Sequence, residues 1–198
     1  MAVHIDIINI LTVGVIVVAS ILLLLILIAK YRRRSRYRIK KVLKPLSRAE
    51  MKNIIIPDGV GGMLEIEHLI LMDQGLLLLE ISSINGHIFG AENINQWTQI
   101  VDGRSYKFAN PLQHIHTTRQ ALMSLVPNVP IHYRIIFSAE ASFPKGKPDQ
   151  VSVLNSLSKD MKSIESGPLM VAPLQQAWER IKRVARKTDK RTEVGEEI

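Results

Sequence analysis

Residues 7–29 form a run of 23 amino acids without a formal charge, which includes the block ILLLLILIA. About 20 apolar residues in a helix span the roughly 30 Å hydrocarbon core of a bilayer. A secretory signal peptide would carry its basic residues before a shorter apolar core. Here His4 and Asp6 precede the run and the basic residues follow it. The sequence therefore predicts a retained N-terminal transmembrane helix over residues 1–29.

A basic segment follows the apolar run directly. Residues 30–48 contain ten Lys or Arg and no acidic residue. Positive residues beside a membrane helix stay on the cytoplasmic side, so we expect the N-terminus outside and the remaining chain inside, at the inner membrane. The same charges favour anionic lipid, at about 1 kcal/mol for each. We interpret residues 30–48 as a juxtamembrane stalk whose partner is lipid rather than nucleic acid.

The rest of the chain is long enough for one soluble domain. It contains no cysteine, which excludes disulfides and thiolate metal sites. Residues 49–179 hold nine basic and thirteen acidic side chains, although the whole chain has a net charge of +8. This balance does not indicate the strongly basic face of a typical nucleic-acid-binding domain. A second basic cluster occurs within residues 180–191.

Hydrophobic patterns predict a mixture of strands and helices. Residues 63–71 and 76–84 read as a hairpin around MDQG, and residues 96–109 as a second hairpin turning at Asp102-Gly103. Asn110 and Pro111 are typical of a helix start, and residues 131–139 read as a buried strand. Asp149 is expected to cap another helix, and a last helix starts near Pro173. The order indicates an α/β or α+β domain with a mixed sheet.

Two glutamates interrupt the first hairpin. If its turn is centred between Asp73 and Gln74, Glu67 lies opposite Glu80. Directly opposed β-carbons are about 5 Å apart, and two like charges there repel by roughly 3 kcal/mol at an effective dielectric near 20. Solvent, a shared proton, a basic side chain or a metal ion must offset this repulsion. A magnesium ion held by both carboxylates and a solvated pair of splayed side chains are both consistent with the spacing.

The string IEHLILMDQGLLLLEISSINGHIFG, followed by Trp97 and FANPLQ, resembles the NERD (nuclease-related domain) family. That family usually reads I-D-H, an apolar hairpin ending in E-x-K, G-x-I-x-G, W and NP-x-x-Q. The strings IPDGVGG and FPKGKP are similar to its membrane-anchored bacterial branch. The resemblance covers about residues 53–148. It implies a restriction-endonuclease-like fold of the PD-(D/E)xK class, with a mixed sheet flanked by helices.

The resemblance also implies site residues. The Asp of I-D-H falls on Glu67, the Glu of E-x-K on Glu80, and the lysine of that motif on Ser82. Glu67 and Glu80 would then bind magnesium, while Ser82 supplies no positive charge. Losing one electrostatic stabiliser costs on the order of 10²–10³ in rate. Gln113 matches the family glutamine and could border the site.

The positions of the histidines indicate ordinary structural roles. His68 alternates with apolar neighbours, which indicates a hydrogen-bonded core residue. His114 and His116 are two apart on a helix and do not share a face as metal ligands would.

The domain boundaries expected are residues 1–29 for the membrane helix, 30–48 for the stalk, 49–170 for the NERD-like domain, and 171–198 for a basic helix with a disordered tail. Three functions remain open: a weak metal-dependent nuclease at the membrane, an inactive nucleic-acid-binding module, and a membrane-tethered interaction domain. The sequence names no protein partner.

Overall fold

The computed structural model describes residues 2–188, with side chains described for residues 13–31 and 33–188. The chain divides into two compact units, Met1–Lys40 and Lys41–Ile198. The tail that the sequence predicts to be disordered lies mostly outside the described residues.

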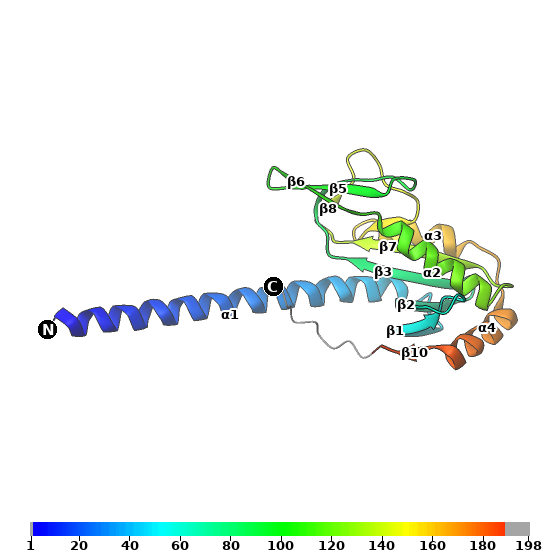
Figure 1. Cartoon of the computed structure of the whole chain (residues 1–198), viewed down its shortest axis with the longest axis horizontal. Helices are drawn as coiled ribbons and strands as arrows, with labels where there is room; N and C mark the ends of the chain where they lie inside the picture. The colour runs from blue at the N-terminus through cyan, green and yellow to red at the C-terminus, as the bar shows by residue number, and fades with distance from the viewer. Residues whose placement is uncertain (1, 189–198) are drawn as a thin grey trace. The chain divides into compact units, whose positions relative to one another are not determined.

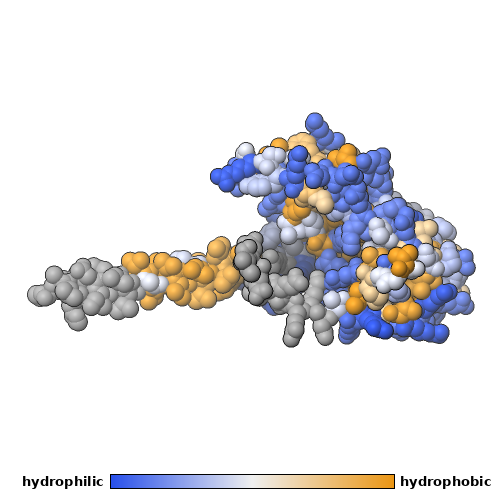
Figure 2. Space-filling model, in the orientation of Figure 1, coloured by the Kyte–Doolittle hydropathy of each residue, from blue (hydrophilic) through white to orange (hydrophobic). Residues whose placement is uncertain are grey.

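Helix α1, Ala2–Leu43, supplies the first unit, continues through the basic segment and ends before Pro45. A proline cannot continue a helix without losing a hydrogen bond. Within the described residues, Val13–Leu43 is the one helix long and apolar enough to cross a membrane, a test that an N-terminal signal sequence also passes. Its apolar side chains between Val13 and Ile28 are exposed, and Figure 2 shows the resulting hydrophobic surface.

The second unit is a mixed α+β domain, as predicted. Its main sheet has six strands in the order β10-β1-β2-β3-β7-β9 (Figure 1). These strands are β1 (Ala49–Pro57), β2 (Met63–Met72), β3 (Gly75–Ser82), β7 (Ile131–Phe137), β9 (Val151–Val153) and β10 (Arg186–Lys187). The β2–β3 hairpin is antiparallel, whereas β3 pairs with β7 in parallel.

A second sheet has four strands in the order β6-β5-β4-β8. They are β4 (Gly86–Phe89), β5 (Gln96–Val101), β6 (Arg104–Ala109) and β8 (Ala141–Ser142). The predicted turn at Asp102-Gly103 is confirmed, and both residues have positive φ. Trp97 is fully buried, as expected of a core residue, and its ring lies 6.2 Å from that of Phe137. Aromatic packing therefore joins the second sheet to the end of β7.

Three helices cover the main sheet: α2 (Pro111–Leu125), α3 (Leu157–Glu165) and α4 (Val171–Val184). Helix α2 packs across β2, β3 and β7, while α3 contacts β9 and α4 contacts β1. The side chain of Tyr133 contacts α2 and that of Arg134 reaches the main chain of α3. Since neighbouring strand residues point to opposite faces, α2 and α3 cover opposite faces of β7.

The helix predicted to start at Asp149 exists, and it carries Leu157 and Met161 as expected, but its predicted start is wrong. Residues 151–153 form strand β9, paired in parallel with β7, and α3 begins only at Leu157. The alternation Val151-Ser152-Val153 is typical of a strand, and the buried edge of β7 supplies its partner. The short strands β4, β8 and β10 were also not predicted as separate elements.

Asn110 fixes where α2 begins. Its Oδ1 accepts a hydrogen bond from the N–H of Leu112 at 2.9 Å, as the sequence predicts for an N-cap. Its Nδ2 donates to the carbonyl oxygens of Ala91, Glu92 and Ile94. One buried side chain thus positions both the helix and the loop before β5.

We predict that Asn110→Ala lowers the free energy of unfolding by about 2–4 kcal/mol. The lost cap contributes about 1 kcal/mol, and the partly buried carbonyls that lose their donor contribute the remainder. Urea unfolding of the full-length chain in detergent, followed by tryptophan fluorescence, measures the change. Asn128→Ala, at an exposed loop position, should stay within about 0.5 kcal/mol. Equal effects of the two substitutions would contradict the assigned role.

Candidate functional site

The candidate site lies where the β2–β3 ladder ends. The recorded register pairs Met72 with Gly75 and continues to His68 with Leu79. Continued by one step, it would set Glu67 opposite Glu80, the register that the sequence predicts. Instead the ladder stops, and the N–H of Ile81 donates to Oε2 of Glu67 at 3.0 Å. The Glu67 carboxylate thereby satisfies a backbone donor at the carboxyl end of β3.

Glu80 lies beside this carboxylate and is only 28% exposed at its side chain. Burial raises its pKa above the usual value, because a low-dielectric environment disfavours the charged form. The nearby charge of His114 opposes that shift, and the charge of Glu67 adds to it. The two carboxylates therefore repel each other, and this repulsion adds to the raised pKa of Glu80.

His114 is a neighbour of the site that the sequence did not predict. Its Nε2 lies 3.4 Å from Oε1 of Glu80, and its side chain is 54% exposed. The contact arises because the first turn of α2 crosses the end of β3. The cap at Asn110 was visible in the sequence, but the path of the helix over the sheet was not. His116 instead packs its ring 6.3 Å from that of Tyr133, so the two histidines have different neighbours, as predicted.

On the other side of Glu67, a short chain of polar side chains begins at His68. Nδ1 of His68 lies 2.8 Å from Oε1 of Glu50, which matches the hydrogen-bonded histidine expected. Nε2 of His68 lies 4.0 Å from Oε1 of Glu67, and Nζ of Lys52 lies 3.1 Å from Oε2 of Glu50. Lys52 thus pairs with Glu50 rather than with Glu67 or Glu80.

Ser82 and Gln113 make local contacts. Ser82 lies two residues after Glu80 on β3. Its Oγ accepts a hydrogen bond from the N–H of Ile84 at 3.3 Å. Nε2 of Gln113 donates to Oδ1 of Asn95 at 2.8 Å, which ties α2 to the loop before β5. Within residues 13–31 and 33–188, no Lys or Arg forms an ion pair with Glu67 or Glu80.

The donor set is compatible with a hard divalent cation. Magnesium prefers oxygen ligands, keeps several waters and often uses only one or two protein carboxylates. Glu67 and Glu80 provide these oxygens, and the repulsion between them would be relieved by a cation. The part of the chain that the structure describes has no group of three or more His, Asp or Glu arranged to hold a metal. Any ion here would therefore be held by few protein ligands.

These features define a mixed α+β domain that carries a carboxylate pair at the end of a central strand, preceded by an apolar helix. Residues 31–138 match the model of the nuclease-related domain, more than half of the chain, and the protein belongs to that family. An uncharacterized protein of Bacillus anthracis is 24% identical over 131 residues, which cover 64% of this chain and 62% of that relative. The matched region thus spans less than two thirds of the relative. No solved structure matches the chain.

We predict that Glu80→Gln raises the thermal unfolding midpoint more at pH 7 than at pH 4 in chelator-containing buffer. The raised pKa of Glu80 means that the parent loses stability as pH rises from the ordinary value of 4.5 through the folded-state value. Glutamine resembles the protonated carboxyl and avoids that loss. Tryptophan fluorescence at the two pH values measures the difference.

The matched control is Glu165→Gln, at an exposed position on α3. Its effect on the midpoint should be the same at both pH values. A Glu80→Gln effect that is constant or smaller at pH 7 would contradict the burial of this carboxylate.

Proposed function

We propose that this protein is a membrane-anchored nuclease-related protein whose Glu67 and Glu80 hold one divalent cation in a degenerate phosphodiesterase site. The observation that supports the proposal is the Glu67 carboxylate bound to the Ile81 N–H beside the half-buried Glu80. This arrangement joins the two residues that correspond to the metal-binding acids of the PD-(D/E)xK class.

A magnesium ion, when bound, would supply Lewis-acid polarisation of a phosphoryl oxygen and a more acidic water. The chain's own residues have simpler tasks. The Ile81 N–H holds one oxygen of Glu67 in place, and Glu80 binds the cation once its proton is lost. Because its pKa is raised, cation binding to Glu80 should strengthen as pH increases.

Ser82 is the reason to call the site degenerate. It corresponds to the family lysine, and a neutral hydroxyl supplies no positive charge to the negative charge that develops on a phosphoryl group. Loss of one such stabiliser costs on the order of 10²–10³ in rate. We propose that His114, 3.4 Å from Glu80, partly replaces the lysine when protonated.

The anchor is the apolar part of α1, and the ten basic residues that follow it favour a cytoplasmic domain at the inner membrane. The stalk would lie against anionic headgroups, which attract Lys and Arg within about one Debye length. Any substrate would then be met close to the membrane surface.

A second candidate function is a non-catalytic module that tethers nucleic acid or a protein to the membrane. It is favoured by the lack, among described residues, of a Lys or Arg ion pair with either carboxylate. The two candidates differ in whether cleavage appears once the missing charge is restored.

We predict that magnesium or manganese stabilises the full-length chain through Glu67 and Glu80. A ligand that binds only the folded state stabilises it by about 2.7 kcal/mol at a hundredfold excess over its dissociation constant. Thermal unfolding in detergent, with and without millimolar metal, measures this gain. Glu80→Gln should abolish it and Glu165→Gln should leave it intact. No gain in the parent would reject the metal site.

The variant Ser82→Lys separates the two candidate functions. If the site lacks only its positive charge, metal-dependent cleavage of DNA or RNA should rise by about 10²-fold over the parent, and Ser82→Lys with Glu80→Gln should be inactive. Fluorescent single- and double-stranded DNA and RNA substrates measure the cleavage by each variant. A folded, metal-binding Ser82→Lys protein that cleaves nothing would favour the non-catalytic module.

We predict that the domain is cytoplasmic. Alkaline phosphatase fused after Ile198 should be inactive in a bacterial host, and green fluorescent protein fused at the same position should fluoresce. The expected orientation follows from the basic residues between Lys30 and Arg48. Replacing six of the ten by Gln should increase the periplasmic fraction. Phosphatase activity in the unmodified fusion would reverse the assigned topology.

A further inference from the structure

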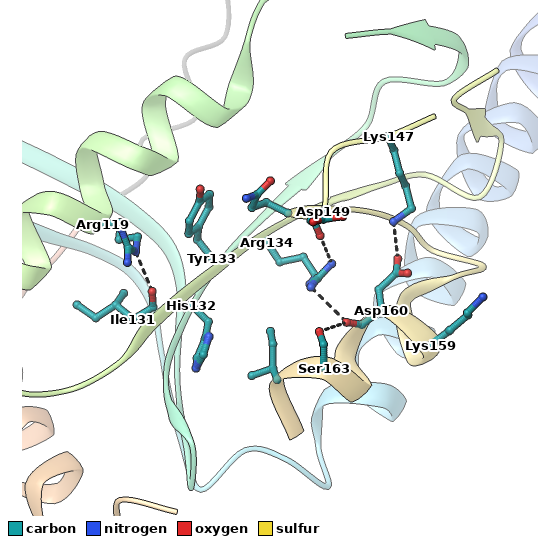
Figure 3. A pocket seen from close by; sticks show the side chains of 12 residues that line it. Arg119, Ile131, His132, Tyr133, Arg134, Lys147, Asp149, Lys159, Asp160 and Ser163 are labelled. Carbon is teal, nitrogen blue, oxygen red and sulfur yellow. Dashed lines mark hydrogen bonds and ion pairs between the residues drawn. The ribbon is translucent and has the colours of Figure 1, made fainter. Parts of the chain in front are cut away.

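A hollow of about 590 Å³ lies away from the carboxylate pair, against the start of β7. Its walls come from α2, β7, the loop before β9 and α3, and Figure 3 shows the side chains that line it. Four basic side chains line it, Arg119, Arg134, Lys147 and Lys159, against two acidic ones, Asp149 and Asp160. The hollow is thus basic, whereas residues 49–179 as a whole hold more acidic than basic side chains.

Arg134 is the central cation of this pocket. It is only 5% exposed, yet its guanidinium donates to neutral oxygens: the carbonyls of Asp149 and Asp160 and Oγ of Ser152. Its Nε is buried and, among the described residues, lacks a hydrogen-bond partner. A buried charge without a direct counter-ion is unfavourable, so an anion in the pocket would stabilise it.

Asp160 does not fill that role directly. Its Oδ2 lies 3.1 Å from Nζ of Lys147 and accepts hydrogen bonds from the hydroxyls of Ser152 and Ser156 at 2.7 Å. Asp160 and Asp149 act on Arg134 only through the longer-range field of their charges. The acidic side chains therefore reduce the positive potential of the pocket without contacting the guanidinium.

The remaining wall offers accessible donors and an aromatic ring. Nε of Arg119 donates to the carbonyl of Ile131 at 2.9 Å, and its guanidinium lies 5.7 Å from the ring centroid of Tyr133. Lys159 is exposed on α3 and has no recorded ion pair among the described residues. The pairing of β7 with β9 begins only at Ile135, so the edge of β7 is open at residues 131–134, where Arg119 and Lys159 line the same hollow and one ligand could contact both.

We propose that this pocket binds a phosphate-bearing anion of nucleotide size, with Arg119 and Lys159 as direct ligands and Arg134 as the buried source of positive potential. Arginine and lysine are the usual phosphate ligands of proteins, and ligand pockets commonly enclose about 300–1,000 Å³. The proposal does not depend on the carboxylate pair, because none of its residues contacts Glu67 or Glu80.

Isothermal titration tests the proposal on the full-length chain in nonionic detergent, with a chelator present to exclude metal. The probes are inorganic pyrophosphate, adenosine monophosphate and a twelve-nucleotide single strand. We expect saturable binding of at least one probe, weakened about tenfold or more by Lys159→Gln and by Arg119→Gln, since a hydrogen bond to a charged group contributes roughly 1.5–3 kcal/mol. Binding of the small anions alone indicates a free nucleotide, and preference for the strand indicates nucleic acid.

Lys162→Gln is the matched control, because Lys162 is exposed on the same helix and does not line the pocket. It should bind like the parent, and so should Glu80→Gln, which separates this site from the proposed metal site. Unfolding midpoints establish that each variant is folded. Absence of saturable binding in the folded parent, or equal losses in Lys159→Gln and Lys162→Gln, would overturn the proposal.

Discussion

The register of the β2–β3 hairpin determines where the charged groups of the candidate site lie. Strand side chains alternate between faces, so a slip of one residue would move one glutamate away from the other. The register is held by the tight turn at Asp73-Gln74 and by Gly75, whose φ is +153°. A β-carbon at Gly75 would lie 2.6 Å from the carbonyl oxygen of Pro130. The start of β3 is thus packed closely against the segment that leads into β7.

Two carboxylates that repel each other lie where the β2–β3 pairing ends. Beyond Leu79 the backbone of β3 no longer pairs with β2, although it still pairs with β7, and a side chain rather than a main-chain carbonyl accepts the Ile81 N–H. This places one carboxylate beside a second that burial already disfavours. A domain selected only for stability would use apolar or neutral residues here, since unpaired buried charge is destabilising. Such a conflict is more typical of binding sites than of cores.

Much of this arrangement could be predicted because local rules and tertiary packing agree. The two hairpins follow from alternating apolar residues and turn residues, and Asn110-Pro111 marks the start of α2. Strand β9 was missed because Asp149 is a good helix cap in isolation, while the edge of β7 that residues 151–153 join is distant in sequence. His114 was missed for a similar reason, since its contact with Glu80 depends on how α2 crosses the sheet. Local patterns cannot supply that crossing.

Helix α2 contributes one side chain to each of the two candidate sites, and the residue at which the helix begins determines where both side chains lie. His114 lies in its first turn beside Glu80, and Arg119 lies five residues later over Tyr133. Five residues correspond to a rise of about 7.5 Å and about 1.4 turns. The cap at Asn110 sets the rotation of the helix, so it sets both contacts at once. The carboxylate pair and the basic pocket therefore each take one side chain from the same helix. The cap at Asn110 therefore fixes the positions of His114 and Arg119 together, although the carboxylate pair and the basic pocket have no residue in common.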